Sequence, residues 1–124
     1  MYRLMIVDDS MIIRNRISRT TEEQFSVVCM AKNGKEAIDL CKKYQPDIVT
    51  IDLTMPEMDG IETIPKLLEV HPSVQILVVS ALNDEATGLE ALELGASGFL
   101  TKPFTENGLL KALNEIVEFI EEED

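Results

Sequence analysis

Three carboxylates, a hydroxyl and an ammonium group follow four short apolar runs of this sequence. Asp8 and Asp9 follow the first run and Asp52 the second, and Ser80 and Lys102 follow the other two. Apolar runs without alternation, rich in β-branched residues, are typical of strands buried on both faces of a parallel sheet. If all four strands are parallel, their carboxyl ends share one edge of the sheet. The five polar side chains would then converge beside Asp52.

Such a group of side chains could bind a divalent cation and take part in phosphoryl transfer. Its ligand atoms are all oxygens, which favours Mg²⁺ or a similar hard ion with room left for waters and a phosphate oxygen. A carboxylate nucleophile beside Mg²⁺ and a lysine is what phosphoryl transfer to aspartate needs, with Ser80 donating to a phosphoryl oxygen. Unless a cation intervenes, repulsion should raise the pKa of at least one carboxylate.

An alternation of strands and helices must position these groups. The pattern predicts strands at 3–8, 25–31, 48–52, 74–79 and 97–101. A helix follows each strand, which predicts an α/β fold, a doubly wound (βα)₅ sandwich with a parallel sheet between two helical layers. Neighbouring strands lie about 4.8 Å apart, so Asp8 and Asp9 can share a site with Asp52 only if the first and third strands are adjacent. The site would then lie at a topological switch point, where doubly wound sheets bind ligands.

Several details of the helices follow from local signals. The predicted helix starts carry capping residues, namely Asp9 or Ser10, Asn33, the Asp59-Gly60 pair, Asn83 and Thr105. In the first helix, Met11, Ile13 and Ile17 are expected on the buried side. In the third, residues 61–70, Pro65 leaves two alternatives: the helix kinks, or its regular part starts near Thr63. Gly88 lies inside the fourth helix and costs roughly 1 kcal/mol relative to alanine, so this helix is expected to be marginally stable and mobile.

The composition favours a small acidic globular domain. The 124 residues predict a single domain, residues 1–124, with no effector domain. The formal net charge of −12 argues against a nucleic-acid partner, because phosphate-backbone binding needs clustered Lys and Arg. No apolar run is long enough to cross a bilayer. Cys29 and Cys41 suggest neither a disulfide framework nor a metal site, so we expect buried, reduced thiols and a cytoplasmic location.

The whole chain resembles the receiver domain of two-component response regulators. The resemblance rests on four segments that end the predicted strands: Val7-Asp8-Asp9-Ser10, residues 52–60 with the sequence DLTMPEMDG, Val79-Ser80-Ala81 and Lys102-Pro103-Phe104. It implies the flavodoxin-like fold of that family, with a five-stranded parallel sheet of order 2-1-3-4-5.

The resemblance also implies roles for individual residues. Asp52 matches the phosphoacceptor, and Lys102 matches the phosphoryl-binding lysine, whose bond to Pro103 is cis in the family. The implied Mg²⁺ ligands are Asp8, largely through water, Asp9, Asp52 and the backbone carbonyl of Thr54. Ser80 and Phe99 match the switch pair, in which the hydroxyl moves toward the phosphoryl group and the ring turns inward. Thr54 and Leu82 occupy variable positions that tune the phosphoryl lifetime.

The implied function is that of a stand-alone response regulator. A sensor histidine kinase or a phosphotransferase would donate the phosphoryl group, and a downstream protein partner would read the switched conformation. Candidates for that partner are a flagellar motor, another kinase or a separate effector, with chemotaxis as one possible pathway. The chain would be a monomeric signalling phosphoacceptor that catalyses only its own phosphotransfer and dephosphorylation, with no other enzymatic activity.

Three other readings fit the residues less well. A hydrolase of the haloacid dehalogenase type needs a second aspartate two residues after Asp52, where Thr54 stands. A flavodoxin-like FMN module needs a phosphate-binding loop after the first strand, where Asp8 and Asp9 would repel the phosphate. An interaction module that keeps the fold without phosphorylation would have no need of the complete set of five polar residues.

Overall fold

The computed structural model describes residues 1–81 and 85–123, in which five strands and five helices alternate along the chain. The strands are β1 (Tyr2–Val7), β2 (Phe25–Ala31), β3 (Ile48–Ile51), β4 (Gln75–Ala81) and β5 (Gly98–Lys102). The helices are α1 (Met11–Thr21), α2 (Gly34–Tyr44), α3 (Gly60–Val70), α4 (Glu85–Glu93) and α5 (Glu106–Glu123). Leu82 and the predicted cap Asn83 lie outside the described residues. Within the described part of the chain, no helix is both long and apolar enough to cross a membrane.

All neighbouring strands of the sheet are parallel, and their order is β2-β1-β3-β4-β5. This is the flavodoxin-like order implied by the resemblance, and β1 and β3 are adjacent, as a shared site of Asp8, Asp9 and Asp52 requires. The register between β1 and the edge strand β2 shifts once: Leu4 pairs with Val27 but Met5 pairs with Cys29, so Val28 is an extra residue in β2. The β1/β3 boundary is the topological switch point.

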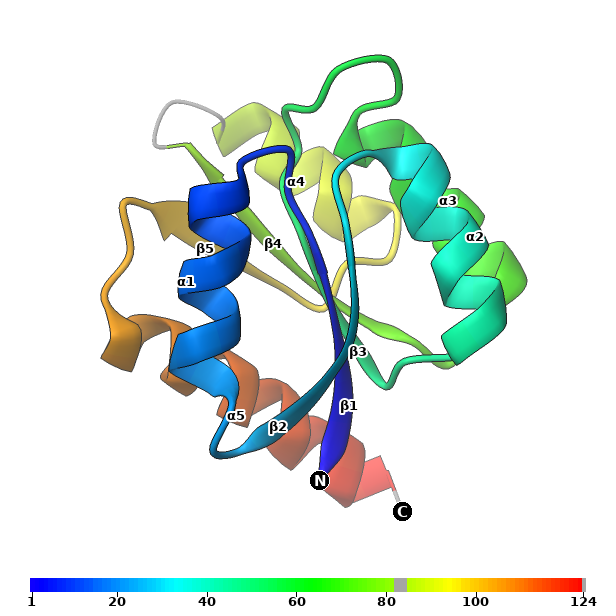
Figure 1. Cartoon of the computed structure of the whole chain (residues 1–124). Coiled ribbons are helices and arrows are strands. Elements are labelled where there is room, and N and C mark those ends of the chain that lie inside the picture. The colour runs from blue at the N-terminus through cyan, green and yellow to red at the C-terminus, as the bar shows by residue number, and fades with distance from the viewer. Residues whose placement is uncertain (82–84, 124) are drawn as a thin grey trace.

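Helices cover both faces of the sheet (Figure 1). On one face, side chains of α2, α3 and α4 such as Cys41, Leu67 and Ala91 pack on the buried residues of the central strands. On the other face, Ile17 of α1 and Leu113 of α5 close a second core. The strands β1, β3 and β4 are therefore buried from both sides, which explains their unbroken apolar sequences.

Side-chain caps start four of the helices, as the sequence predicted. The first helix is capped by Ser10, not Asp9: the Ser10 hydroxyl accepts a hydrogen bond from the backbone N–H of Ile13 at 3.3 Å. Equivalent bonds start the later helices, from Glu36 N–H to Asn33 (2.8 Å), from Glu62 N–H to Asp59 (2.9 Å) and from Gly108 N–H to Thr105 (2.9 Å). These caps fix where each strand-to-helix loop ends.

One prediction for the helices was wrong, and one of the two alternatives for α3 is excluded. Met11 is 65% exposed and does not belong to the buried side of α1, whereas Ile17 does. The regular part of α3 does not start near Thr63: the helix begins at Gly60, and Pro65 lies inside it. Pro65 is on the exposed side of α3, and as a proline it cannot donate the hydrogen bond that the carbonyl of Ile61 would otherwise accept.

Candidate functional site

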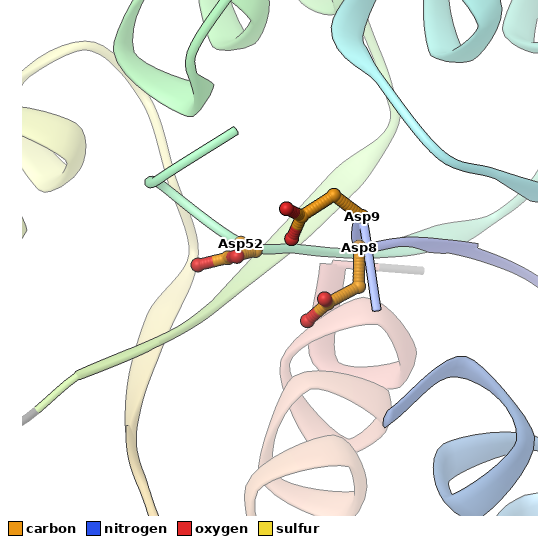
Figure 2. A group of neighbouring side chains, drawn as sticks. All are labelled: Asp8, Asp9 and Asp52. Atoms are coloured by element: carbon orange, nitrogen blue, oxygen red, sulfur yellow. The ribbon is translucent and has the colours of Figure 1, made fainter. Parts of the chain in front are cut away.

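Three aspartates meet at the carboxyl ends of β1 and β3 (Figure 2). One carboxylate oxygen from each of Asp8, Asp9 and Asp52 lies within 4.8 Å of the others. Asp8 is 1% exposed and Asp52 is 6% exposed, while Asp9 is open to solvent. The predicted convergence of these three groups is therefore present in the structure.

Lys102, the last residue of β5, joins this group from the other side of β4. Its Nζ atom lies 2.9 Å from Asp8 Oδ2, to which it donates a hydrogen bond, and 3.5 Å from Asp52 Oδ2. The ammonium therefore bridges the two buried carboxylates. The Lys102–Pro103 peptide bond is cis, as expected from the resemblance.

Burial and neighbouring charges set the protonation behaviour of the site. Burial is the largest influence on Asp52 and raises its pKa, Lys102 lowers it, and the charges of Asp8 and Asp9 raise it further. The pKa of Asp52 is raised on balance, as predicted for one member of the group, although burial contributes more than repulsion. Burial alone would lower the pKa of Lys102, but its hydrogen bond to Asp8 and the charge of Asp52 raise it instead.

Backbone contacts place Asp52 beside Asp8. The Asp52 N–H donates to the carbonyl of Val7 at 3.0 Å, which continues the β1–β3 ladder to the end of the strands. The Oδ1 atom of Asp52 accepts a hydrogen bond from Thr54 N–H at 3.2 Å. Gly60 closes the loop, since its N–H donates to Leu53 at 2.9 Å and a Cβ there would lie 2.8 Å from the Asp52 carbonyl oxygen. The sequence indicated a turn at Asp59-Gly60 but not this close approach.

The predicted switch pair lies on the two strands beside the site. Ser80 is fully buried near the end of β4 and pairs with Thr101 of β5. Phe99 is half-buried and packs against the core between the sheet and α4. The ring lies against Gly88 of α4, so closely that a Cβ at Gly88 would be 2.6 Å from Phe99 Cε2. Their movement on phosphorylation stays a prediction, as does the part of the Thr54 carbonyl in metal binding.

Two arginines of α1 were missed as parts of the site. In the structure, Arg14 Nη1 donates to the Asp8 carbonyl at 2.6 Å, and Arg16 Nη2 donates to the Phe104 carbonyl at 2.6 Å. No sequence signal marks the Arg16 contact, because its partner is 88 residues away along the chain.

The fold and the acidic edge are those of a flavodoxin-like signalling domain, and comparisons with known proteins agree. The model of the response regulator receiver domain matches residues 4–114. The chain is 39% identical to the chemotaxis protein CheY of Thermotoga maritima over 115 residues, which is 92% of this chain and 96% of that protein. It is 36% identical to the CheY of Bacillus subtilis, with the same coverage.

Solved structures give the same result. The CheX-CheY complex of Borrelia burgdorferi, determined with BeF3 and Mg, contains a chain that matches 94% of this chain with a TM-score of 0.88 and 31% identity, over 89% of its own length. This chain therefore belongs to the response regulator receiver domain family. Its members are the signalling proteins of two-component systems.

The residues at the acidic edge fit a small divalent cation. Three carboxylates offer oxygen ligands within one 4.8 Å group, and oxygen is the ligand that Mg²⁺ prefers. Two of these carboxylates are buried, and among residues 1–81 and 85–123 only one ammonium lies between them. The three carboxylates together carry more negative charge than the single ammonium offsets, and a bound cation would neutralise the remainder.

Proposed function

We propose that this chain is a stand-alone response regulator that accepts a phosphoryl group on Asp52 from a histidine kinase or phosphotransferase. The observation that carries the proposal is the placement of Lys102, 3.5 Å from an oxygen of Asp52 and bonded to Asp8 at 2.9 Å. A phosphoryl group transferred to Asp52 would therefore lie beside this ammonium, which could pair with one of its oxygens. The chain spans 96% of the length of both CheY relatives named above.

In the proposed reaction, an Asp52 carboxylate oxygen attacks the phosphorus of a phosphohistidine. The new bond is P–O, the bond that breaks is P–N, and the imidazole of the donor leaves with the electron pair. Asp8, Asp9, Asp52 and the Thr54 carbonyl would hold Mg²⁺, which when bound neutralises charge on the phosphoryl oxygens. Lys102 pairs with one phosphoryl oxygen, and the Ser80 hydroxyl donates to another. The chain would catalyse only its own phosphorylation and dephosphorylation.

The direct test is phosphorylation of the purified protein by acetyl phosphate in the presence of Mg²⁺. We expect the intact mass to rise by one phosphoryl group, which hydroxylamine should remove because acyl phosphates are labile to it. A protein that stays unmodified under these conditions, or that gains a hydroxylamine-resistant group, would contradict the proposal.

We also propose that the surface formed by α4, β5 and α5 binds the downstream partner. Gly88, Leu89, Leu92, Phe99 and Thr101 line a groove of about 400 Å³ between α4 and β5. Leu89 is 63% exposed and Phe119 of α5 is 50% exposed, so apolar side chains are available on this surface. Phe99 reaches both the groove and the core, which would couple partner binding to the state of the site. The partner would be a flagellar motor, a kinase or a separate effector, and the CheY relatives favour chemotaxis.

The proposal includes a monomeric protein in the cytoplasm. Cys29 and Cys41 are free thiols, as expected in a reducing compartment. Cys41 is buried, but Cys29 is only half-buried, which corrects the expectation that both are buried. Burial raises the pKa of Cys41 to about 11, so this thiol stays protonated at neutral pH.

Mg²⁺ is expected to stabilise the fold by binding the acidic edge. At a concentration tenfold above the dissociation constant, binding adds about 1.4 kcal/mol to the free energy of unfolding, which raises the melting temperature by a few degrees. Thermal melts with and without Mg²⁺ measure this shift. Asp9→Ala should remove most of it, whereas Asp39→Ala on the exposed side of α2 should keep it. An undiminished shift in Asp9→Ala would place the ion elsewhere.

The phosphoryl group on Asp52 is expected to be hydrolysed slowly. The attacking water must approach opposite the Asp52 oxygen, and the resemblance places Thr54 and Leu82 beside that path. The Thr54 side chain is exposed, and neither residue has a carboxylate or amide to orient the water. Replacing Thr54 with Asn and Leu82 with Glu should speed phosphate release about tenfold, equivalent to roughly 1.4 kcal/mol in the barrier. A release rate equal to or below that of the parent would show that these positions do not control the water.

A further inference from the structure

Arg16 of α1 contacts the loop that follows β5 in two ways. Its Nη2 atom donates a hydrogen bond of 2.6 Å to the carbonyl oxygen of Phe104. Its Cζ atom lies 4.6 Å from the centre of the Phe104 ring, which places the guanidinium over the ring face. Phe104 is itself 6% exposed and belongs to the core between the sheet and α1 and α5. One side chain of α1 therefore holds both the backbone and the ring of a buried residue.

Phe104 lies close to Lys102 in the chain, so its contacts with Arg16 affect the position of Lys102. Phe104 is two residues beyond Lys102 and directly precedes Thr105, which caps α5. The short segment between the end of β5 and the start of α5 is thus held at its α5 end by the cap and laterally by Arg16. A displacement of this segment would move the backbone from which Lys102 reaches Asp8 and Asp52.

The same helix also holds the other end of the Lys102–Asp8 bond. Arg14 Nη1 donates to the backbone carbonyl of Asp8 at 2.6 Å. Helix α1 therefore contacts the backbone at Asp8 through Arg14 and near Lys102 through Arg16. These two contacts lie on either side of the ion pair, in which Lys102 Nζ is 2.9 Å from Asp8 Oδ2. The arginine type suits this task, because a planar guanidinium can donate in its plane while it stacks on an aromatic ring, and a lysine ammonium cannot do both in the same way.

We propose that Arg16 is a positioning residue that acts through Phe104 to hold the Lys102 ammonium in place for phosphoryl transfer to Asp52. The inference rests on the proposed function and deepens it. Without Arg16, the loop after β5 loses its lateral contact, and Lys102 no longer meets the incoming phosphoryl group in the right geometry. Misplacement of a catalytic group by a fraction of an ångström to one ångström is costly in rate.

The experiment compares Arg16→Met, Arg16→Lys and the control Arg19→Met, which removes the same charge from an exposed position of the same helix. With acetyl phosphate and Mg²⁺, Arg16→Met should be phosphorylated about tenfold more slowly than the parent, and Arg19→Met should stay within about twofold. Arg16→Lys keeps the positive charge near the ring and should lie between these two. Thermal melts confirm that each variant is folded, and Arg16→Lys serves if Arg16→Met does not fold.

Two further measurements separate positioning from a general structural role. In a Lys102→Met background, Arg16→Met should cause no additional loss of rate, because the group it positions is gone. In the unphosphorylated protein, the ¹⁵N resonance of the Lys102 ammonium, assigned by its absence in Lys102→Met, should shift in Arg16→Met and not in Arg19→Met. An unchanged resonance, or an equal loss of rate with and without Lys102, would overturn the inference. If the parent protein takes up no phosphoryl group, the proposed function is contradicted. The ¹⁵N resonance of Lys102 would still test the role of Arg16 in that case.

Discussion

Asp52→Asn is expected to take up no phosphoryl group from acetyl phosphate and to unfold at a higher temperature than the parent. The loss of phosphorylation should be complete, because the amide oxygen of asparagine is not a nucleophile of the required kind. The other carboxylates of the site cannot replace it. Asp8 is engaged by Lys102 and by the Ser10 N–H, and Asp9 is exposed at the rim.

The gain in stability follows from the raised pKa of Asp52. Burial raises this pKa above the ordinary value of 3.8, and Asp8 and Asp9 add to the effect against the opposing charge of Lys102. The native state therefore binds a proton at Asp52 more tightly than the unfolded state does. As the pH rises through this pKa, the stability that the protonated form contributes is lost. Asparagine does not ionise, so the variant avoids this loss at neutral pH.

Melting curves at pH 7 without Mg²⁺ measure the expected rise of a few degrees. The advantage should shrink as the pH falls below the ordinary pKa of an aspartate, since Asp52 is then protonated in both states. Asp39→Asn is the matched control, because it removes the same charge from an exposed position of α2. Labelling that survives Asp52→Asn would identify another phosphorylated residue. A variant that melts below the parent would contradict the electrostatic argument.

Gly88→Ala is expected to destabilise the protein, although alanine is the better helix former. Helix propensity alone would favour alanine by roughly 1 kcal/mol, so the substitution would stabilise α4 if no clash followed. The structure shows that a clash does follow: the new Cβ would lie 2.6 Å from Phe99 Cε2 and 2.8 Å from Cδ2. Overpacking typically costs about 1–3 kcal/mol, so the free energy of unfolding should fall on balance.

A double-mutant cycle tests the assigned cause. Phe99→Val removes the ring atoms that meet the new methyl group, so in that background Gly88→Ala should stabilise the protein. The coupling between the two positions, measured by denaturant unfolding of the four proteins, should reach about 1–2 kcal/mol. Equal effects of Gly88→Ala in both backgrounds would show that Phe99 does not set the cost. The cycle would also establish that α4 and the ring of Phe99 form one packed unit, as the proposed switch requires.

The sequence alone predicted most of the fold and the acidic group at its edge. Buried strands leave unbroken apolar runs, and parallel strands bring their carboxyl ends together, so Asp8, Asp52 and Lys102 could be placed near one another from their positions alone. The strand order was harder to predict, because hydrophobic patterns do not specify which strands are neighbours. It came from the adjacency that the aspartates require and from the resemblance to receiver domains.

The remaining features depend on contacts that the sequence does not record. Met11 is an exception, because the helical period of about 3.6 residues already places it on a different side of α1 from Ile13 and Ile17, in agreement with its 65% exposure. Pro65 could not be placed because its cost depends on whether water reaches the carbonyl it leaves unpaired. The Gly88–Phe99 and Arg16–Phe104 contacts join different elements, so neither produces a local pattern.

The extra residue in β2 has a consequence for the behaviour of the protein at high concentration. An edge strand presents unpaired backbone groups to which the strand of another molecule can add, and this is a common route to aggregation. Val28 interrupts the regular spacing of β2 against β1. Such a bulge bends and twists a strand. A strand from a second molecule that adds to β2 would therefore find matching donors and acceptors over only part of its length. The bulge thus disfavours aggregation through the β2 edge of the sheet.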